Sequence, residues 1–206
     1  MTIKATFKSD DASCAKDDTC PMSAFTDLDK NAWYHDGIHF VLDNGIMSGY
    51  GKGKFAPDDT TSRAMVAQLL WNMEGKPVVN YAMNYTDVAK DAWYADAIRF
   101  ATAQGLMSGY GNGKFGPNDA MTREQLVALM YRYAQLKNAD VTIGEDTNIL
   151  SYGDVQTVSE WAIPAMQWAC GSGILNGIDG NLVPAGKASR AQVATMIMRF
   201  ITSIAK

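Results

Sequence analysis

Residues 25–75 read FTDLDKNAWYHDGIHFVLDNGIMSGYGKGKFAPDDTTSRAMVAQLLWNMEG, and residues 85–135 repeat the pattern as YTDVAKDAWYADAIRFATAQGLMSGYGNGKFGPNDAMTREQLVALMYRYAQ. A third, more divergent copy over residues 152–201 reads YGDVQTVSEWAIPAMQWACGSGILNGIDGNLVPAGKASRAQVATMIMRFI. The first two copies align without a gap, so that Trp33 matches Trp93. Because one unit of this size cannot bury its own apolar face, we expect the copies to pack against one another.

The copies divide the chain into a leader and three repeats that form one folded unit. We predict a polar leader over residues 1–24 that is poorly ordered apart from the stretch just before Phe25. The predicted repeats span residues 25–76, 85–136 and 152–203. The start of the leader lacks the apolar stretch of a secretory signal, and we expect the chain to be part of a larger exported protein.

Each copy predicts a helix, a glycine-rich loop and a second helix. We expect the first helices over Trp33–Asn44, Trp93–Gln104 and Trp161–Cys170, each ending at a glycine suited to a left-handed cap. The second helix carries apolar residues at positions i, i+3, i+4 and i+7, as in Val66, Leu69, Leu70 and Met73. A serine or threonine caps its start.

These elements predict an all-α protein in which three helix-loop-helix repeats close around a pseudo-threefold axis. A short open solenoid is the alternative. The net charge of −4 and the pI of about 5.1 exclude a basic surface for nucleic acid. The chain also contains no apolar run near the ~20 residues that a membrane span needs, so we expect no membrane insertion.

An arginine follows the capping hydroxyl in every copy, at Arg63, Arg123 and Arg190. The first turn of a helix carries a partial positive charge and unpaired N–H groups, so an arginine there has the wrong sign locally. Together the guanidinium and the N–H groups would suit a carboxylate or phosphate. The alternative is internal pairing with Asp27, Asp87 and Asp154, and arginine has enough donors for both roles.

Aromatic and glycine residues near the arginines allow two interpretations. Trp33, Trp93 and Trp161 are expected first as core anchors, although an exposed indole beside an arginine would stack on a sugar ring. The loops SGYGKGKFAP and SGYGNGKFGP are weak candidates for phosphate loops because no strand precedes them. We expect their glycines to supply positive φ angles.

Cysteine and histidine residues occur near the start of the chain. Cys14 and Cys20 would form a short-loop disulfide in an oxidising compartment, or remain as two exposed thiols. His35 and His39 imitate the H-E-x-x-H zinc motif, but the glutamate is absent and copy two lacks both histidines. We therefore expect two surface histidines, no metal and no cofactor. Since no nucleophile–base pair recurs with the repeat, we expect no catalytic residue and no enzyme activity.

The repeated motifs resemble those of the S-layer homology family over nearly the whole chain. Each copy opens with an aromatic-x-Asp, at Phe25-Thr-Asp27, Tyr85-Thr-Asp87 and Tyr152-Gly-Asp154. The turn motif appears as Gly45-Ile-Met-Ser-Gly49, Gly105-Leu-Met-Ser-Gly109 and Gly173-Ile-Leu-Asn-Gly177. The family's Thr-Arg-Ala-Glu is Ser-Arg63-Ala-Met, Thr-Arg123-Glu-Gln and Ser-Arg190-Ala-Gln here, so its final glutamate is lost in every copy.

The resemblance implies a three-lobed spindle that anchors a protein to the bacterial cell wall from the extracellular side. In this family the grooves between lobes bind a secondary cell-wall polysaccharide with pyruvate ketals, or in some bacteria a modified peptidoglycan, and the motif arginine holds the carboxylate. Copy three has Ile178 where the others have a tyrosine, so its groove is the least expected to bind. The expected ligand-binding residues are Arg63, Arg123, Arg190, Asp27, Asp87, Asp154, Trp33, Trp93, Trp161, Gly49, Gly109, Gly177, Tyr50 and Tyr110.

Overall fold

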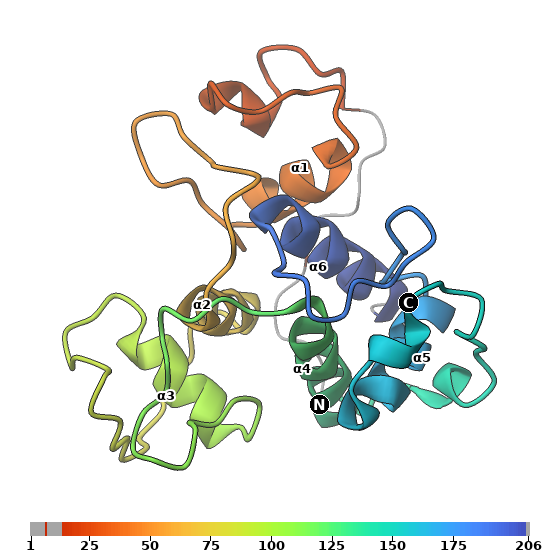
Figure 1. Ribbon diagram of the computed structural model, residues 1–206. Coiled ribbons are helices and arrows are strands. Elements are labelled where there is room, and N and C mark those ends of the chain that lie inside the picture. Colours follow the sequence, from red (N-terminus) through yellow and green to blue (C-terminus); the bar gives the residue numbers. More distant parts are fainter. Residues whose placement is uncertain (1–6, 8–13, 205–206) are drawn as a thin grey trace.

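The computed structural model describes residue 7 and residues 14–204, and its long elements are α-helices (Figure 1). The six helices are α1 (His35–Asp43), α2 (Arg63–Met73), α3 (Ala95–Ala103), α4 (Arg123–Leu136), α5 (Ile163–Gly171) and α6 (Arg190–Ile204). Short 3₁₀ turns are η1 (Pro21–Ala24), η2 (Thr142–Gly144), η3 (Val155–Thr157) and η4 (Glu160–Ala162). The prediction of an all-helical protein with two helices in each copy is confirmed.

The ends of the helices follow the predicted local signals. Thr122 and Gln125 form a complete capping box at the start of α4, while Ser62 accepts the N–H of Met65 at the start of α2. Gly45 follows the end of α1 with a φ of 63°, which places it in the left-handed region that glycine adopts without strain. One boundary was wrong, because the first helices begin two residues after each tryptophan.

The main helix pairs join different copies rather than the two helices of one copy. The second helix of each copy packs against the first helix of the next, which gives the pairs α2 with α3 and α4 with α5. The last helix, α6, packs against α1 and so closes the ring. Figure 1 shows α2, α4 and α6 around the centre, with α1, α3 and α5 in three outer lobes. The open solenoid is thereby excluded.

A cycle of three backbone hydrogen bonds lies where the second helices begin. The N–H of Thr61 donates to the carbonyl of Ala188, Ala188 N–H donates to Met121, and Met121 N–H donates back to Thr61, each at 2.9 Å. All three residues occupy the same position in their copies and are buried. Because each copy both donates and accepts once, this cycle defines the predicted pseudo-threefold axis.

Apolar side chains from all three copies fill one core. The predicted stripe on α2 is buried, and so are its equivalents on α4 and α6. Aromatic rings connect copies two and three as well, because Phe200 of α6 lies 5.6 Å from Tyr133 of α4 and Trp168 of α5 lies 5.4 Å from Tyr131 of α4. A buried ion pair of 2.5 Å between Glu74 and Lys137 joins the far ends of α2 and α4.

The stretch of the leader just before Phe25 is ordered, as predicted, and forms η1. Met22 of η1 is buried against the core, and η1 contacts α1. Cys20 is 3% exposed and His35 is 4% exposed, so the expectation of exposed thiols is wrong for Cys20, and that of surface histidines is wrong for His35. Apolar contact with α1 orders this segment. Residues 1–6 and 8–13, predicted to be poorly ordered, lie outside the described residues. Among the described helices, none has the length and apolar character to cross a membrane.

The axis contains one polar group without a partner, which gives a stability test. Thr61 is fully buried, and its Oγ1 makes no hydrogen bond within the described part of the chain. An unpaired buried hydroxyl costs on the order of 1–3 kcal/mol. We expect Thr61→Val to raise the free energy of unfolding by about 1 kcal/mol in urea denaturation.

Thr195→Val is the matched control for this change. Thr195 is also buried, but its Oγ1 donates to the carbonyl of Ala191 at 3.0 Å. We expect this variant to lose about 1 kcal/mol. Equal losses in both variants would show that the Thr61 hydroxyl has a partner and would contradict the argument.

Candidate ligand-binding grooves

The arginine at the start of each second helix reaches into the loop of the next copy. Arg190 opens α6, and its Nε donates to the carbonyl of Phe55 at 2.8 Å and its Nη2 to the carbonyl of Ser48 at 2.7 Å. The same pair of bonds recurs from Arg63 to Phe115 and Ser108, and from Arg123 to Leu182 and Asn176. These bonds use Nε and Nη2 in every copy, so the N–H groups of Nη1 take no part in binding the loop.

The backbone at each helix start is bonded to the same neighbouring loop. The N–H groups of Arg63 and Ala64 donate to the carbonyls of Asp119 and Pro117 at 2.9 and 3.0 Å. The starts of α4 and α6 repeat this arrangement. The expectation of unpaired N–H groups at these helix starts is therefore wrong, and any anion must be held by side chains. We call the arginine side chain with these two N–H groups the inter-copy clasp.

The repeated aspartates hold the same loops from within their own copy. Asp27 accepts the N–H groups of Phe55 and Ala56 at 3.0 and 2.8 Å, and Asp87 and Asp154 bind the equivalent N–H groups in their copies. Partial burial would raise the pKa of Asp27, but the N–H donors outweigh it and lower that pKa. Within the described part of the chain no ion pair joins these aspartates to the arginines, so their predicted internal pairing is wrong.

The arginines of two copies are also stacked on aromatic rings. The Cζ atom of Arg190 lies 4.5 Å from the ring centroids of both Tyr50 and Phe55. Arg63 lies 5.0 Å from Tyr110 and 4.6 Å from Phe115. Such cation–π contacts hold a guanidinium in one orientation. The equivalents in copy three are Ile178 and Leu182, so Arg123 lacks this support.

The three arginines differ in how deeply they are buried. Arg123 and Arg190 are 3% and 4% exposed, whereas Arg63 is only partly buried. Burial lowers the pKa of Arg123 and Arg190, yet a guanidinium keeps its charge at neutral pH. Each buried charge is therefore stabilised by the carbonyls of the loop.

The three tryptophans are exposed rather than buried in the core. Trp33, Trp93 and Trp161 are 66%, 61% and 58% exposed. Their expected role as core anchors is therefore wrong. Trp33 and Trp93 contact the next tyrosine edge-on, with ring centroids 5.5 and 5.1 Å apart. An indole fixed at one edge and open on its face is suited to stacking on a flat or apolar ligand surface.

Two cavities bring an exposed indole and an arginine together. The copy-one groove, of about 230 Å³, is lined by the turn 46–50, by α2, by Trp93 and by Arg190. The copy-three groove, of about 480 Å³, is lined by residues 175–179, by α6, by Trp33 and by Arg123. Each groove thus takes its turn and helix from one copy, its tryptophan from the next and its arginine from the third. In copy two, Arg63 bonds the carbonyl of Ser108, at the turn position equivalent to Ser48 of copy one.

At the turn glycines a residue with a larger side chain does not fit. A Cβ on Gly49 would collide with the ring of Phe25 and with the carbonyl of Lys54. Gly109 meets Tyr85 and Gly177 meets Tyr152 in the same way. Their role is close packing, whereas Gly51 and Gly53, further along the loop, have the predicted positive φ.

One groove position escaped the sequence analysis. Nine residues after the motif arginine, the copies carry Asn72, Arg132 and Arg199. Asn72 lines the copy-one groove and Arg199 lines the copy-three groove. In the amide orientation that satisfies both groups, Asn176 accepts from the two terminal nitrogens of Arg199 at 3.1 and 3.3 Å. The alignment of the copies contains this position, but its residue type differs between copies, so no shared motif marks it.

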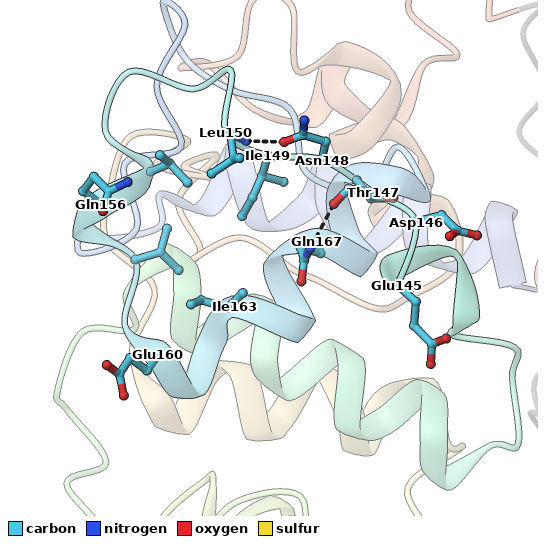
Figure 2. A pocket seen from close by; sticks show the side chains of 12 residues that line it. Glu145, Asp146, Thr147, Asn148, Ile149, Leu150, Gln156, Glu160, Ile163 and Gln167 are labelled. Carbon is cyan, nitrogen blue, oxygen red and sulfur yellow. Dashed lines mark hydrogen bonds between the residues drawn. The ribbon is translucent and has the colours of Figure 1, made fainter.

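A larger cavity, of about 630 Å³, lies between the second linker and α5 (Figure 2). Its charged lining residues are Glu145, Asp146 and Glu160, and no arginine or lysine lines it. The linker is fastened there by Gln167, which donates to the carbonyl of Thr147 at 3.0 Å. Its negative lining makes this cavity a poor site for an acidic ligand.

The ring of three copies and the grooves between them define a small helical module that displays repeated indole–arginine sites. The chain belongs to the S-layer homology domain family, whose pattern matches residues 24–65, 84–127 and 151–194. Each matched segment begins one residue before a predicted copy. Family membership places the chain among extracellular proteins of the bacterial cell surface.

Curated relatives share most of this chain. It is 30% identical over 200 residues, or 96% of the chain, to an amylopullulanase of Thermoanaerobacterium thermosulfurigenes, of which it covers 10%. It is 27% identical over 186 residues, or 86% of the chain, to the surface-layer 125 kDa protein of Lysinibacillus sphaericus, of which it covers 15%. It is 27% identical over 159 residues, or 75% of the chain, to a cellulosome-anchoring protein of Acetivibrio thermocellus, of which it covers 35%. The chain therefore spans only a minor part of the length of these relatives.

The inter-copy clasp predicts that the arginines stabilise the fold to different degrees. Arg190→Ala removes a buried hydrogen bond to the carbonyl of Phe55 and a partly buried one to the carbonyl of Ser48, and we expect it to lower the free energy of unfolding by about 3 kcal/mol. Arg63→Ala should cost less, because water can replace the exposed bond to Ser108. Urea denaturation of both variants tests the order.

Arg99→Ala serves as the control. Arg99 pairs with the exposed carboxylate of Asp96 on the surface of α3, and such pairs contribute about 0–1 kcal/mol. Losses as small for Arg190→Ala as for Arg99→Ala would show that the clasp does not hold the copies together.

Proposed function

We propose that this chain is a non-catalytic module that anchors a larger exported protein to the cell wall by binding an acidic, pyruvylated polysaccharide in its grooves. The relatives named for the surface layer and for anchoring support this role. The observation that carries the proposal is the exposed indole beside a fixed guanidinium in two separate grooves. An acidic sugar has an apolar ring face for the indole and a carboxylate for the guanidinium.

The two groups would bind different parts of one sugar residue. The face of Trp93 or Trp33 stacks on the apolar face of the ring. The guanidinium contributes its remaining donors to the carboxylate, in a charge-assisted hydrogen bond. Because the loop carbonyls and the aromatic rings already fix the Arg190 side chain, binding orders few additional groups.

Positive charge in the grooves supports an anionic ligand although the whole chain is acidic. The net charge of −4 gives no long-range attraction for an anion. The copy-three groove nevertheless combines Arg123 and Arg199 with the single carboxylate of Asp179, and the copy-one groove contains Arg190 and no acidic side chain. Recognition of the polysaccharide is therefore local and depends on contact with these side chains.

The grooves are not equivalent. The expectation that copies one and two bind better than copy three rests on Tyr50 and Tyr110, and it stays a prediction. Arg199 and the larger volume of the copy-three groove support a different ligand preference there, for a sugar with more than one acidic group. Asn72 at the same position in copy one suits a neutral hydroxyl.

The exposed tryptophans allow a binding test that leaves the fold intact. We expect Trp93→Ala to weaken binding to purified wall polysaccharide in the copy-one groove about tenfold, as loss of an aromatic anchor does. The melting temperature should not change, because the indole is exposed. Titration calorimetry measures the affinity.

Tyr81→Ala is the control, since Tyr81 is an exposed aromatic residue outside the lining of both grooves. Equal affinity of the Trp93→Ala variant and the Tyr81→Ala variant would refute the indole's role.

The acidic group on the sugar gives a second test. We expect removal of the pyruvate ketals by mild acid to weaken binding at least tenfold, because it eliminates a charge-assisted bond of about 1.5–3 kcal/mol. Purified peptidoglycan without the polysaccharide serves as the comparison ligand. Undiminished binding of the depyruvylated polymer would contradict the carboxylate's role, and tight binding of peptidoglycan alone would favour the modified-peptidoglycan alternative.

A structural or protein-interaction role for the arginines is the second candidate. The inter-copy clasp favours it, because two guanidinium nitrogens of each arginine already bond the loop. It predicts that Arg190→Ala loses stability and that Trp93→Ala changes nothing. A loss of glycan binding in the Trp93→Ala variant at unchanged melting temperature would decide for the binding module.

A further inference from the structure

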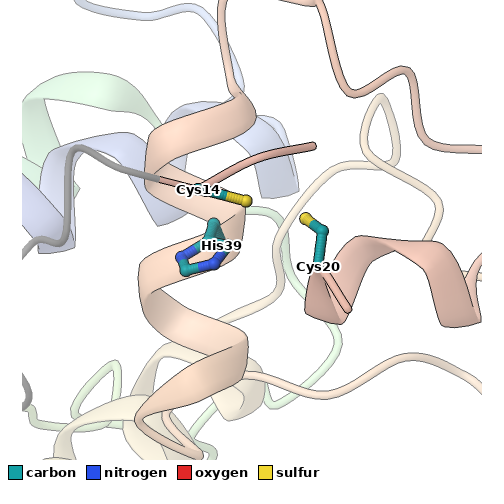
Figure 3. A group of neighbouring side chains, drawn as sticks. All are labelled: Cys14, Cys20 and His39. Carbon is teal, nitrogen blue, oxygen red and sulfur yellow. The ribbon is translucent and has the colours of Figure 1, made fainter. Parts of the chain in front are cut away.

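Three potential metal ligands meet between the leader and α1. The sulfur atoms of Cys14 and Cys20 and a ring nitrogen of His39 all lie within 4.8 Å of one another (Figure 3). Cys14 and Cys20 come from the leader, and His39 comes from the middle of α1. Thiolate and imidazole are the ligands that zinc prefers in structural sites.

A second histidine faces the same cysteine. The Nε2 atom of His35 lies 3.7 Å from the sulfur of Cys20. Its Nδ1 atom lies 2.8 Å from a carboxylate oxygen of Asp36. If Nδ1 donates to this carboxylate, the lone pair of Nε2 points toward the sulfur. Metal-binding histidines are oriented by a carboxylate in this way.

The spacing suits a tetrahedral zinc ion. At the tetrahedral angle, bonds of about 2.3 Å to sulfur and about 2.0 Å to nitrogen place neighbouring ligand atoms roughly 3.3–3.8 Å apart. The distance of 3.7 Å from Cys20 to His35 falls in this range. His35 does not belong to the group whose atoms all lie within 4.8 Å, so its ring would have to move toward Cys14 and His39 to complete the site. Two thiolates and two neutral imidazoles would balance the charge of Zn²⁺, which matters because Cys20 and His35 are buried.

Copy three shows what the side chains at this position of a first helix can do. The first helix of copy three carries Ile163 and Gln167 at the positions of His35 and His39, and Gln167 bonds the linker segment that precedes its copy. In copy three the outer face of the first helix thus fastens the preceding segment, whereas in copy two the equivalent Arg99 pairs with Asp96 of its own helix. In copy one, the leader is the segment at this place, and a metal ion would replace the hydrogen bond.

We propose that Cys14, Cys20 and His39 bind a structural zinc ion, with His35 as the fourth ligand, and so fasten the leader to α1. Both thiols lose their protons on binding. Four protein ligands leave no open position for water, so the site is not that of a hydrolase. The proposal does not depend on glycan binding.

The test measures metal content in the full 206-residue chain, purified with reduced thiols and loaded with zinc or cobalt. We expect one zinc per chain that survives desalting, and the intense visible absorption of tetrahedral cobalt with thiolate ligands. Cys20→Ser and His39→Ala should each lose the metal. Cys170→Ser is the matched control, because it removes the remaining cysteine, which lies away from this cluster, and should keep the metal.

Removing zinc should also lower the melting temperature, and added zinc should restore it in the parent chain but not in Cys20→Ser. This readout does not require glycan. Absence of stoichiometric metal in the reduced chain would overturn the proposal, as would equal metal content in Cys20→Ser. A Cys14–Cys20 disulfide in the protein isolated from the cell surface, shown by mass spectrometry, would overturn it in favour of the disulfide.

Discussion

The fold depends on the way each second helix binds the glycine loop of the next copy. A helix start with an arginine concentrates positive charge, which would be unfavourable by itself. Here four carbonyls of the neighbouring loop surround that start: Phe55 and Ser48 accept from the Arg190 side chain, and Asp59 and Pro57 accept from the backbone of α6. The guanidinium and the positive end of the helix dipole are thus stabilised by carbonyls of the same loop.

The binding grooves are a consequence of this arrangement. The turn that is held on its inner side by an arginine from one copy is flanked on its outer side by a tryptophan from another. Arginine suits the position because its donors point in several directions, so some bond the loop and others remain for a ligand. A lysine, with one compact charge, would not reproduce both sets of bonds.

Local features were predictable from the sequence, and pairing between copies was not. The caps of α2 and α4 depend on residues three positions apart, so Ser62 and Thr122 were sufficient to place them. The apolar stripe on α2 showed that this face is buried but did not identify α3 as its partner. Trp93 was predicted to open a helix and to anchor the core, yet α3 begins only at Ala95, so the indole lies outside the helix.

The partners of the arginines had no sequence signal. A backbone carbonyl is present at every residue, so the sequence could suggest the aspartates but not the carbonyls of Phe55 or Leu182. Cys20 and His35 were likewise considered in separate motifs, because the leader and α1 give no sign of their contact until both are folded. Side chains from distant segments meet only through tertiary structure.

Because the copy-one and copy-three grooves each combine parts of all three copies, a single sixty-residue copy does not contain a complete groove. A substitution in one copy alters the turn of one groove, the indole of a second or the guanidinium of the third, depending on its position. Deleting or exchanging a single copy would disturb every site at once. The triplet is therefore the smallest piece that recombination can move between proteins with these grooves intact, while differences among the copies still give each groove its own lining.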